Sequence, residues 1–278
     1  MERPLVSDRA HPPGQQQPPR IDASVAHSAR LRDYLLGGKN NYPVDREIGE
    51  QVLARDPHLR DAARADRGFL VRAVRHLAGE VRIRQFLDVG TGLPTANNTH
   101  QVAQATAPTC RIVYVDNDPL VLAHARALLT STPQGETAYI QADVRDPDKI
   151  VQEAVRTLDF TQPVGLMLLG IVNYIMDTDE AHTVVDRLLD ALASGSYLAL
   201  SHPTAEIHGE AVEESMRFWN ESGAAPLRTR SRHELLSFFN RLELLEPGVV
   251  SCSRWRPGPS DLGVPDEVHQ YCGVGRKP

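Results

Sequence analysis

The segment FLDVGTG, residues 86–92, decides the predicted fold of this chain. It is an apolar run that reaches an acid, Asp88, and is followed by Gly90 and Gly92. A strand that leaves a sheet in a sharp turn needs glycine there, because glycine adopts positive φ and its bare backbone lets a ligand approach closely. The segment RIVYVD, residues 111–116, is a second apolar run that ends in an acid. In a βαβ unit such an acid meets ribose hydroxyls, so the two segments together predict a nucleotide-binding α/β fold.

The spacing of the glycines distinguishes between two classes of nucleotide ligand. A dinucleotide fingerprint, GxGxxG, would place its third glycine at position 95, where this chain has Thr95. The sequence also lacks an obvious Tyr-x-x-x-Lys set for hydride transfer. An NAD-dependent oxidoreductase is therefore the less favoured alternative.

The pattern Asp88-x-Gly90-x-Gly92 resembles motif I of class I S-adenosylmethionine-dependent methyltransferases, with Pro94 at the place of the usual third glycine. The resemblance continues at VDNDP, residues 115–119, and at ADVR, residues 142–145. Longer segments are similar to a bacterial family called S-adenosyl methyltransferase over roughly residues 21–275. These segments are YLLGGKNN from residue 34, FLDVGTGLPTANNTH from 86, VYVDNDPLVLAHARALL from 113, and LLG from 168 followed by NYIMD. The resemblance implies a Rossmann-like fold and S-adenosylmethionine as cofactor, and it leaves the methyl acceptor open.

Ligands of open α/β sheets lie outside the carboxyl ends of the strands, so the residues that follow each strand are the candidates for the site. By the resemblance, Gly90 and Gly92 let the methionine part of the cofactor approach, and Asp116 binds both ribose hydroxyls. Asp143 is expected to accept from the adenine amino group, beside the backbone of Val144. The full expected cofactor-binding set is Asp88, Gly90, Thr91, Gly92, Asp116, Asn117, Asp143, Val144 and Gly170.

Two residues are candidates for catalysis by their position after central strands. Methyl transfer from a sulfonium requires alignment and exclusion of water, and a general base is optional. His202 could take a proton, because the ordinary pKa of histidine lies near neutral pH. Tyr174 could shape the acceptor pocket or contact the positive sulfonium with its ring. A buried, satisfied histidine and a packed tyrosine are the alternative interpretations.

The polar run from Tyr34 to Asn41 is unlike core-filling sequence, because Gly37 and Gly38 are followed by Lys39 and two asparagines. We expect this segment to fold over the cofactor end of the sheet. Tyr34, Lys39 and Asn41 are its candidate contacts, with Lys39 binding a carboxylate of the cofactor or of the acceptor. The alternative is that Gly37 merely caps a helix and Lys39 is solvated.

Composition limits the class of protein. The chain has 278 residues, a net charge of −6 and a hydrophobic share of 41%, which is ordinary for a globular protein. Nucleic-acid backbones are bound through Lys and Arg, so the negative charge favours a small-molecule substrate over a nucleic acid. No run approaches the roughly 18 apolar residues of a membrane span, and the first residues lack the apolar core of a signal peptide. We therefore expect a cytoplasmic protein without membrane association.

The cysteines and histidines do not predict a metal site. Cys110, Cys252 and Cys272 show no CxxC or similar spacing and cannot all pair with one another. We expect them to be reduced and buried. The histidines are scattered, so no metal is expected.

The order of predicted elements gives a domain plan. Residues 1–20 contain five prolines and few apolar side chains, which predicts a disordered tail. Residues 21–80 follow a helical pattern and predict an N-terminal helical cap. Residues 81–278 predict a Rossmann-like domain with a seven-stranded, mostly parallel sheet, helices on both faces and an antiparallel C-terminal strand. Helices are expected to start at Asp118-Pro119 and Asp146-Pro147 and to include residues 232–242, with closing strands at 249–255 and 268–274.

Two classes of function agree with these sequence patterns. The favoured one is a methyltransferase that uses S-adenosylmethionine on an unidentified, small-molecule acceptor. The other is a non-catalytic S-adenosylmethionine-binding or regulatory module. The acceptor atom, the use of a general base and the oligomeric state do not follow from the sequence.

Overall fold

The computed structural model describes residues 24–128, 130–258 and 263–278, so the tail predicted for residues 1–20 lies outside the described residues. In this part of the chain, eight strands form one sheet. Their bounds in chain order are β1 Gln85–Val89, β2 Arg111–Asp116, β3 Glu136–Gln141, β4 Gly165–Leu169, β5 Tyr197–Pro203, β6 Glu243–Leu244, β7 Val250–Ser251 and β8 Gln270–Arg276.

The order of strands across the sheet is β3-β2-β1-β4-β5-β8-β6, and β7 also pairs with β8. Strands β1 to β5 are parallel to one another, whereas β8 is antiparallel to β5, β6 and β7. The chain order reverses between β1 and β4, and open α/β sheets bind ligands in the crevice at such a switch point. The mostly parallel Rossmann-like sheet with an antiparallel C-terminal strand is confirmed.

The C-terminal part of the sheet differs from the expected seven strands. The strand expected at 249–255 is limited to β7, which leads into a 3-10 turn, Cys252–Arg254. The helix expected at 232–242 ends at Ser237, and β6 follows it. Pro247, which has no N–H, and Gly248, with a φ of 84°, lie between β6 and β7. They interrupt the pairing, because a strand cannot continue through such a pair.

The described helices begin where the sequence provides caps. Asp118 Oδ1 accepts a hydrogen bond from the N–H of Leu120 at 2.8 Å, and Asp146 Oδ1 accepts from the N–H of Lys149 at 3.2 Å. Both helices have proline at their first position, as predicted. The bounds are α1 Ser28–Leu35, α2 Pro43–Arg55, α3 Leu59–Gly79, α4 Thr99–Thr106, α5 Pro119–Leu128, α6 Pro147–Ala154, α7 Thr178–Asp190, α8 Gly209–Glu221 and α9 Arg232–Ser237.

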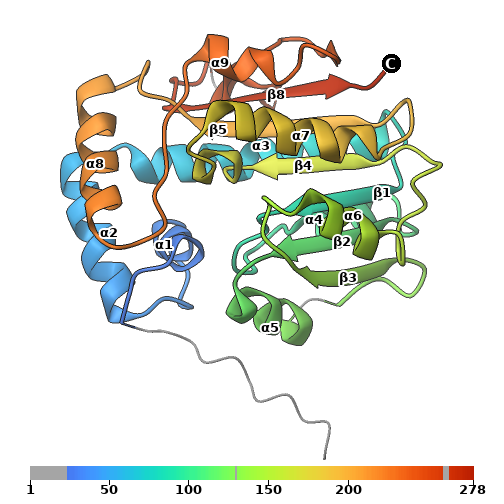
Figure 1. The fold of residues 1–278 in the computed structure, drawn as a ribbon, viewed down its shortest axis with the longest axis horizontal. Coiled ribbons are helices and arrows are strands. Elements are labelled where there is room, and N and C mark those ends of the chain that lie inside the picture. Colours follow the sequence, from blue (N-terminus) through green and yellow to red (C-terminus); the bar gives the residue numbers. More distant parts are fainter. Residues whose placement is uncertain (1–23, 129, 259–262) are drawn as a thin grey trace, which may run out of the picture.

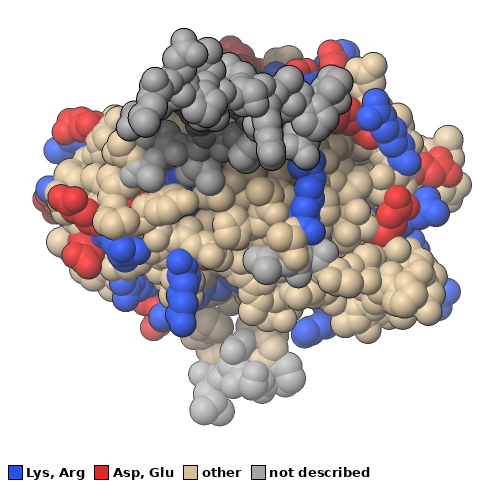
Figure 2. Space-filling view, turned by 90° about the horizontal axis from the view of Figure 1, so that it is seen from below, with Lys and Arg blue, Asp and Glu red and all other residues tan. Residues whose placement is uncertain are grey.

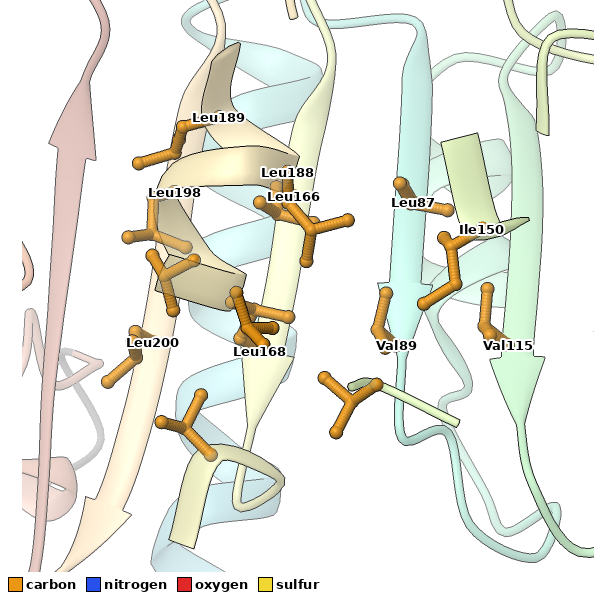
Figure 3. Close-up of a cluster of buried hydrophobic side chains, with 14 of the residues drawn as sticks. Leu87, Val89, Val115, Ile150, Leu166, Leu168, Leu188, Leu189, Leu198 and Leu200 are labelled. Carbon is orange, nitrogen blue, oxygen red and sulfur yellow. The ribbon is translucent and has the colours of Figure 1, made fainter. Parts of the chain in front are cut away.

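Helices cover both faces of the sheet (Figure 1). Alternation along each strand sends Leu87 and Val89 to the face covered by α6 and α7, where they join one apolar cluster (Figure 3). Phe86 points to the opposite face and packs in a second cluster with side chains of α3 and α4. Each fully buried large apolar side chain contributes about 1.5–3 kcal/mol, so the two clusters hold the sheet rigidly beneath the site. The three cysteines are free and buried, as expected.

Helices α1, α2 and α8 form a layer at the carboxyl ends of the parallel strands, at the left of Figure 1. Leu31 of α1, Val52 of α2 and Trp219 of α8 belong to one buried cluster. Helix α3 begins at this layer through Ala63 and then continues beneath the sheet. The cap is therefore built from two segments that are far apart in sequence. The division of the chain at residue 80 stays a prediction.

The surface carries charges of both signs. On the face that Figure 2 shows, they lie largely toward the two sides, with uncharged residues over much of the middle. Among the described residues, no helix is both long enough and apolar enough to cross a membrane.

Candidate active site

A cavity lies between the carboxyl ends of the strands and the cap helices. It holds about 1070 Å³ of empty space, part of which is open to solvent. The lining on the sheet side offers backbone and polar side chains at Gly90, Gly92, Asp116, Asn117, Gly170 and Asn173, beside the apolar Leu169 and Ile171. The lining on the cap side is largely apolar and includes Leu31, Leu35, Val52, Met216, Trp219 and Leu227.

Glycines on the sheet side leave the backbone accessible to a ligand. Gly90 has a φ of 78°, and a Cβ there would lie 2.6 Å from Ile171 Cγ1. Gly92 has a φ of 66°, and the place of its Cβ has nothing within 4 Å. Side chains at these positions would strain the turn or project into the open space, which accounts for the glycine pattern after β1.

Asp116, at the end of β2, is 7% exposed and lines the cavity. Its Oδ2 accepts from the N–H of Gly92 at 2.9 Å, and its Oδ1 accepts from the N–H of Asp118 at 2.9 Å. Burial raises the pKa of Asp116, while these two backbone N–H groups oppose the shift. A carboxylate has about four lone-pair positions, so each oxygen keeps one for a further donor such as a hydroxyl.

Arg32 of α1 places a cation over the sheet side of the cavity. It forms an ion pair with Asp66 of α3, whose side chain is 1% exposed, whereas that of Arg32 is 37% exposed. A Cβ on Gly170 would lie 3.7 Å from Nη1 of Arg32. The guanidinium is thus held above Gly170 and retains donors for an anionic group. Arg32 was not among the residues predicted from the sequence, although its spacing from Ser28 and Leu35 is that of one helix face.

Asn173 and Tyr174 enter the cavity from the 3-10 turn η1, Val172–Tyr174. Oδ1 of Asn173 is buried and has no hydrogen-bond partner among the described residues. Burial raises the pKa of Tyr174, while the neighbouring side chains of Ser28, Arg32 and Asn173 oppose the shift. The phenol therefore stays protonated near neutral pH, so Tyr174 can donate a hydrogen bond or present its ring, and its catalytic role stays a prediction.

Three arginines hold η1 and the residues after it in place. Together they donate to the backbone carbonyls of residues 172–176, which follow β4. The bonds are Arg230 to Val172 O (3.2 Å) and Ile175 O (2.9 Å), the N–H of Arg228 to Asn173 O (3.0 Å), the Arg228 side chain to Met176 O (2.9 Å), and Arg145 to Tyr174 O. The positions of Asn173 and Tyr174 thus depend on residues distant in sequence.

His202 does not reach the cavity, so the catalytic role expected for it is wrong. Its side chain is 1% exposed. Because Arg230 Nη1 can only donate, Nε2 of His202 accepts from it at 2.8 Å, and Nδ1 donates to Pro203 O at 2.8 Å. Burial lowers the pKa of His202 to about 3, with Arg230 adding to the shift. The alternative interpretation, a buried and satisfied histidine, describes the structure.

Asp88 and Thr91 support the turn from below, outside the cavity lining. Alternation along β1 places Asp88 on the face of α3 and α4, where it is 5% exposed and Oδ2 accepts from Thr99 Oγ1 at 2.6 Å. Thr91 Oγ1 donates to Asp88 O at 3.1 Å. We therefore correct the expected role of Asp88 from direct cofactor contact to support of the glycine turn, whereas contact of Thr91 with the cofactor stays a prediction.

The pH dependence of stability should reveal the burial of Asp88. Burial raises its pKa from 3.8 to about 6, so the folded state binds this proton more tightly than the unfolded state. Asp88 therefore adds to the free energy of unfolding below about pH 4, and this contribution is lost as pH rises through about 6. Between these values we expect Asp88→Asn to gain about 2 kcal/mol relative to wild type, because each pKa unit is worth roughly 1.4 kcal/mol and relaxation reduces the total.

Urea unfolding across this pH range measures the effect. The exposed Asp266→Asn carries the same chemical change and serves as the matched control. If the difference between Asp88→Asn and wild type does not vary with pH, the buried carboxyl is not held in the protonated form.

Asp143 lies in a depression next to the main cavity. Asn117 lines both the depression and the cavity and so connects them. Asn117 Nδ2 donates to Asp143 Oδ2 at 3.2 Å, and the N–H of Arg145 donates to Oδ1 at 2.9 Å. The side chain of Val144 is buried in the apolar cluster under α6. Contact of these two residues with an adenine stays a prediction, and neither lines the main cavity.

Lys39 and Asn41 line a different depression, on the outer side of the cap. Tyr34 lines the same depression, and its ring packs beside Gly49 of α2. Contrary to expectation, Tyr34, Lys39 and Asn41 therefore do not line the main cavity, whereas Leu35 of the same segment does. Helix α1 itself covers the carboxyl ends of the strands, through His27, Ser28 and Arg32. The described chain contains no group of three or more His, Cys, Asp or Glu that could hold a metal.

A family model described as S-adenosyl methyltransferase matches residues 14–278. The chain belongs to this family. A solved DUF574 family protein from Streptomyces avermitilis MA-4680 is 47% identical, with a TM-score of 0.89 over 93% of this chain and 100% of that one. A proposed methyltransferase from Thermobifida fusca YX is 40% identical, with a TM-score of 0.84 over 92% and 96%. None of the curated proteins matches this chain.

Membership in the S-adenosyl methyltransferase family makes this protein an enzyme whose cofactor is S-adenosylmethionine. The cavity fits that cofactor by the chemistry of its donors and acceptors. The backbone at Gly92 is open to a ligand, Asp116 has free lone pairs for a pair of hydroxyls, and Arg32 offers a cation for a carboxylate. The unpartnered Oδ1 of Asn173 suits an ammonium donor.

Proposed function

We propose that this enzyme transfers the methyl group of S-adenosylmethionine to a small, largely apolar acceptor held between the sheet and the cap. The observation that carries the proposal is that one cavity has two unlike sides. The strand ends supply backbone and polar groups, whereas the facing residues of α2, α8 and the start of α3 are mostly apolar. Such enclosure suits a small molecule better than a nucleic acid, whose binding requires an extended row of cations.

S-adenosylmethionine supplies an electrophilic methyl group, whose bond to sulfur breaks as the bond to the acceptor forms and the electron pair stays on sulfur. The residues of the chain bind, align and exclude water. Asp116 binds the ribose, the backbone from Gly90 to Gly92 allows close approach, and the cap helices keep water away from the reacting carbon. Tyr174 donates to or packs against the acceptor, and the acceptor's proton leaves without help from His202.

Arg32 is assigned to the carboxylate of the cofactor's methionine end, and Asp66 positions it. We expect Arg32→Gln to weaken binding of S-adenosylhomocysteine about 5-fold, because a partly exposed charge pair contributes about 1 kcal/mol. Calorimetry measures the affinity directly. Binding of 5′-methylthioadenosine, which lacks the amino acid part, should be unchanged in the same variant. Equal weakening for both ligands would contradict the assignment.

The acceptor class can be tested without knowing the acceptor. A bacterial extract is divided into a small-molecule filtrate and a retained macromolecular fraction, and each is incubated with enzyme and methyl-labelled S-adenosylmethionine. We expect label to transfer to the filtrate, into compounds that reversed-phase resin retains. Label on protein or nucleic acid in the retained fraction would contradict a small acceptor.

A variant that fills the apolar side provides the matched control. Met216→Trp should abolish transfer to the filtrate while the affinity for S-adenosylhomocysteine stays within about 2-fold, since Met216 lies on the cap side of the cavity. If the variant transfers methyl groups as well as wild type does, the acceptor does not bind against α8.

A further inference from the structure

The loop between α1 and α2, together with residues of α1, α2 and α3, lines a basic depression on the cap that is distinct from the active-site cavity. Its lining contains four cations and, among the described residues, no Asp or Glu: the cations are Lys39, Arg46, Arg60 and Arg64. The whole chain has a net charge of −6. A concave gathering of like charges costs energy through repulsion unless it is used, so the depression calls for an anionic occupant.

The loop that bears Lys39 is held in one conformation. Asp33, which is 2% exposed, accepts from the N–H of Asn40 at 2.8 Å and from Nδ2 of Asn41 at 2.7 Å. A Cβ on Gly38 would lie 2.0 Å from this carboxylate, so only glycine fits there. The Asp33 charge is thus turned inward and satisfied by the loop. A rigid loop lowers the entropy cost of binding.

Arg46 and Arg60 are themselves fixed in place. Arg46 Nη1 donates to the main-chain and side-chain oxygens of Asn41 at 2.8 and 3.0 Å. Arg60 Nη2 donates to the hydroxyl of Tyr34 at 3.2 Å, and its guanidinium lies 5.4 Å from the centre of the Tyr34 ring. The Tyr34 side chain thus holds Arg60 in the depression and does not line the active-site cavity.

Arg60 also has unused donors. Its Nε is buried and has no hydrogen-bond partner among the described residues. A buried guanidinium N–H without an acceptor is costly, and phosphate and carboxylate groups match the fork of donors that arginine presents. Arg64 pairs with Asp61 at 3.5 Å, but both side chains are more than 60% exposed, so that pair is weak and leaves Arg64 free to bind an anion.

We propose that this depression is a second ligand site, which binds a phosphate or carboxylate group of a small molecule through Lys39, Arg60, Arg46 and Arg64. The site goes beyond the methyl transfer and does not depend on it. Leu35 lines both this depression and the active-site cavity, so the anion lies directly behind the helix that carries Arg32. The group comes either from a separate anion or from an anionic end of the acceptor.

Calorimetry with inorganic pyrophosphate tests the site, using the full chain saturated with S-adenosylhomocysteine at constant ionic strength. We expect one binding site. Arg60→Gln should weaken binding at least 10-fold and Lys39→Gln about 5-fold, since charge-assisted bonds are among the strongest in proteins. The matched control is Arg75→Gln, an exposed arginine of α3 outside the depression, which should bind pyrophosphate like wild type.

Three results would overturn the proposal. They are no pyrophosphate binding at millimolar concentration, equal weakening in Arg75→Gln, and tighter binding of a single-stranded oligonucleotide than of pyrophosphate, which would indicate a nucleic-acid surface. Lys39→Gln should leave the affinity for S-adenosylhomocysteine unchanged, and this shows that the variant is folded. A loss of that affinity would instead place Lys39 in the cofactor site.

The source of the anionic group follows from one more measurement. If pyrophosphate competes with the small-molecule filtrate in the methyl-transfer assay, the depression takes an anionic end of the acceptor. If pyrophosphate binds but does not compete, the depression takes a separate anion. Both results support the site, and neither depends on identifying the acceptor.

Discussion

Asp116→Ala is expected to weaken binding of S-adenosylhomocysteine about 100-fold. The carboxylate of Asp116 is 7% exposed and faces the cavity, so its bonds to two ribose hydroxyls would form away from water. Hydrogen bonds to charged groups contribute about 1.5–3 kcal/mol, and 100-fold corresponds to about 2.7 kcal/mol. The variant also removes the acceptor for the N–H of Gly92, which loosens the glycine turn. Calorimetry gives the affinity.

Two further variants separate the ribose contact from the turn. Asp116→Asn keeps the shape and one oxygen acceptor, so we expect an intermediate loss of about 10-fold. The exposed Asp148→Ala should bind like wild type. If Asp116→Ala remains folded and keeps the wild-type affinity, Asp116 does not bind the cofactor.

Arg230→Met should lower the free energy of unfolding by about 3–5 kcal/mol. Arg230 is 2% exposed, and its removal leaves Ile175 O and Nε2 of His202 without a donor, whereas Val172 O keeps the N–H of Ile175 at 3.1 Å. Each buried group left unsatisfied costs about 1–3 kcal/mol. Urea unfolding measures the change. Methyl transfer should also fall under conditions where the variant is folded, because Asn173 and Tyr174 lose the support of η1.

An arginine on the surface provides the comparison. Arg241 forms exposed ion pairs with Asp186 and Asp190, so Arg241→Met should change the free energy of unfolding by no more than about 0.5 kcal/mol. Arg230→Lys should recover part of the loss, since an ammonium group retains donors. A loss below about 1 kcal/mol in Arg230→Met would show that η1 does not depend on this arginine.

The sheet could be predicted because its signals are local. Apolar runs that reach Asp88 and Asp116 determine the strands, the glycines after the first run determine a turn, and Asp118-Pro119 after the second determines a helix start. None of these signals needs distant contacts. The C-terminal strands could not be predicted as well. Their length depends on how Pro247 and Gly248 interrupt pairing with β8, and pairing is a long-range property.

The candidate site likewise contains residues that local sequence signals predict and residues that they do not. Glycines and acids that directly follow strands reach the cavity because the topology brings all carboxyl ends to one edge. The face of the sheet to which a side chain at that edge points depends on long-range packing. For this reason Asp88 and His202 were wrongly predicted to reach the cavity. Lys39 was misplaced because the rotation of α1 is set by contacts such as that between Arg30 Nε and Asp45 Oδ2, at 2.8 Å. No local pattern reveals that rotation.

The two-part construction of the cap has a consequence for synthesis of the chain on the ribosome. Leu31 and Val52 are made early, whereas Trp219 and Leu227, which cover them, are made about 170–200 residues later. The apolar faces of α1 and α2 therefore remain uncovered while the first five strands assemble. A nascent chain can complete its parallel strands before the cavity between the strand ends and the cap helices has formed. Truncation before α8 would leave an intermediate with exposed apolar surface on α1 and α2, and we expect chaperones to bind it.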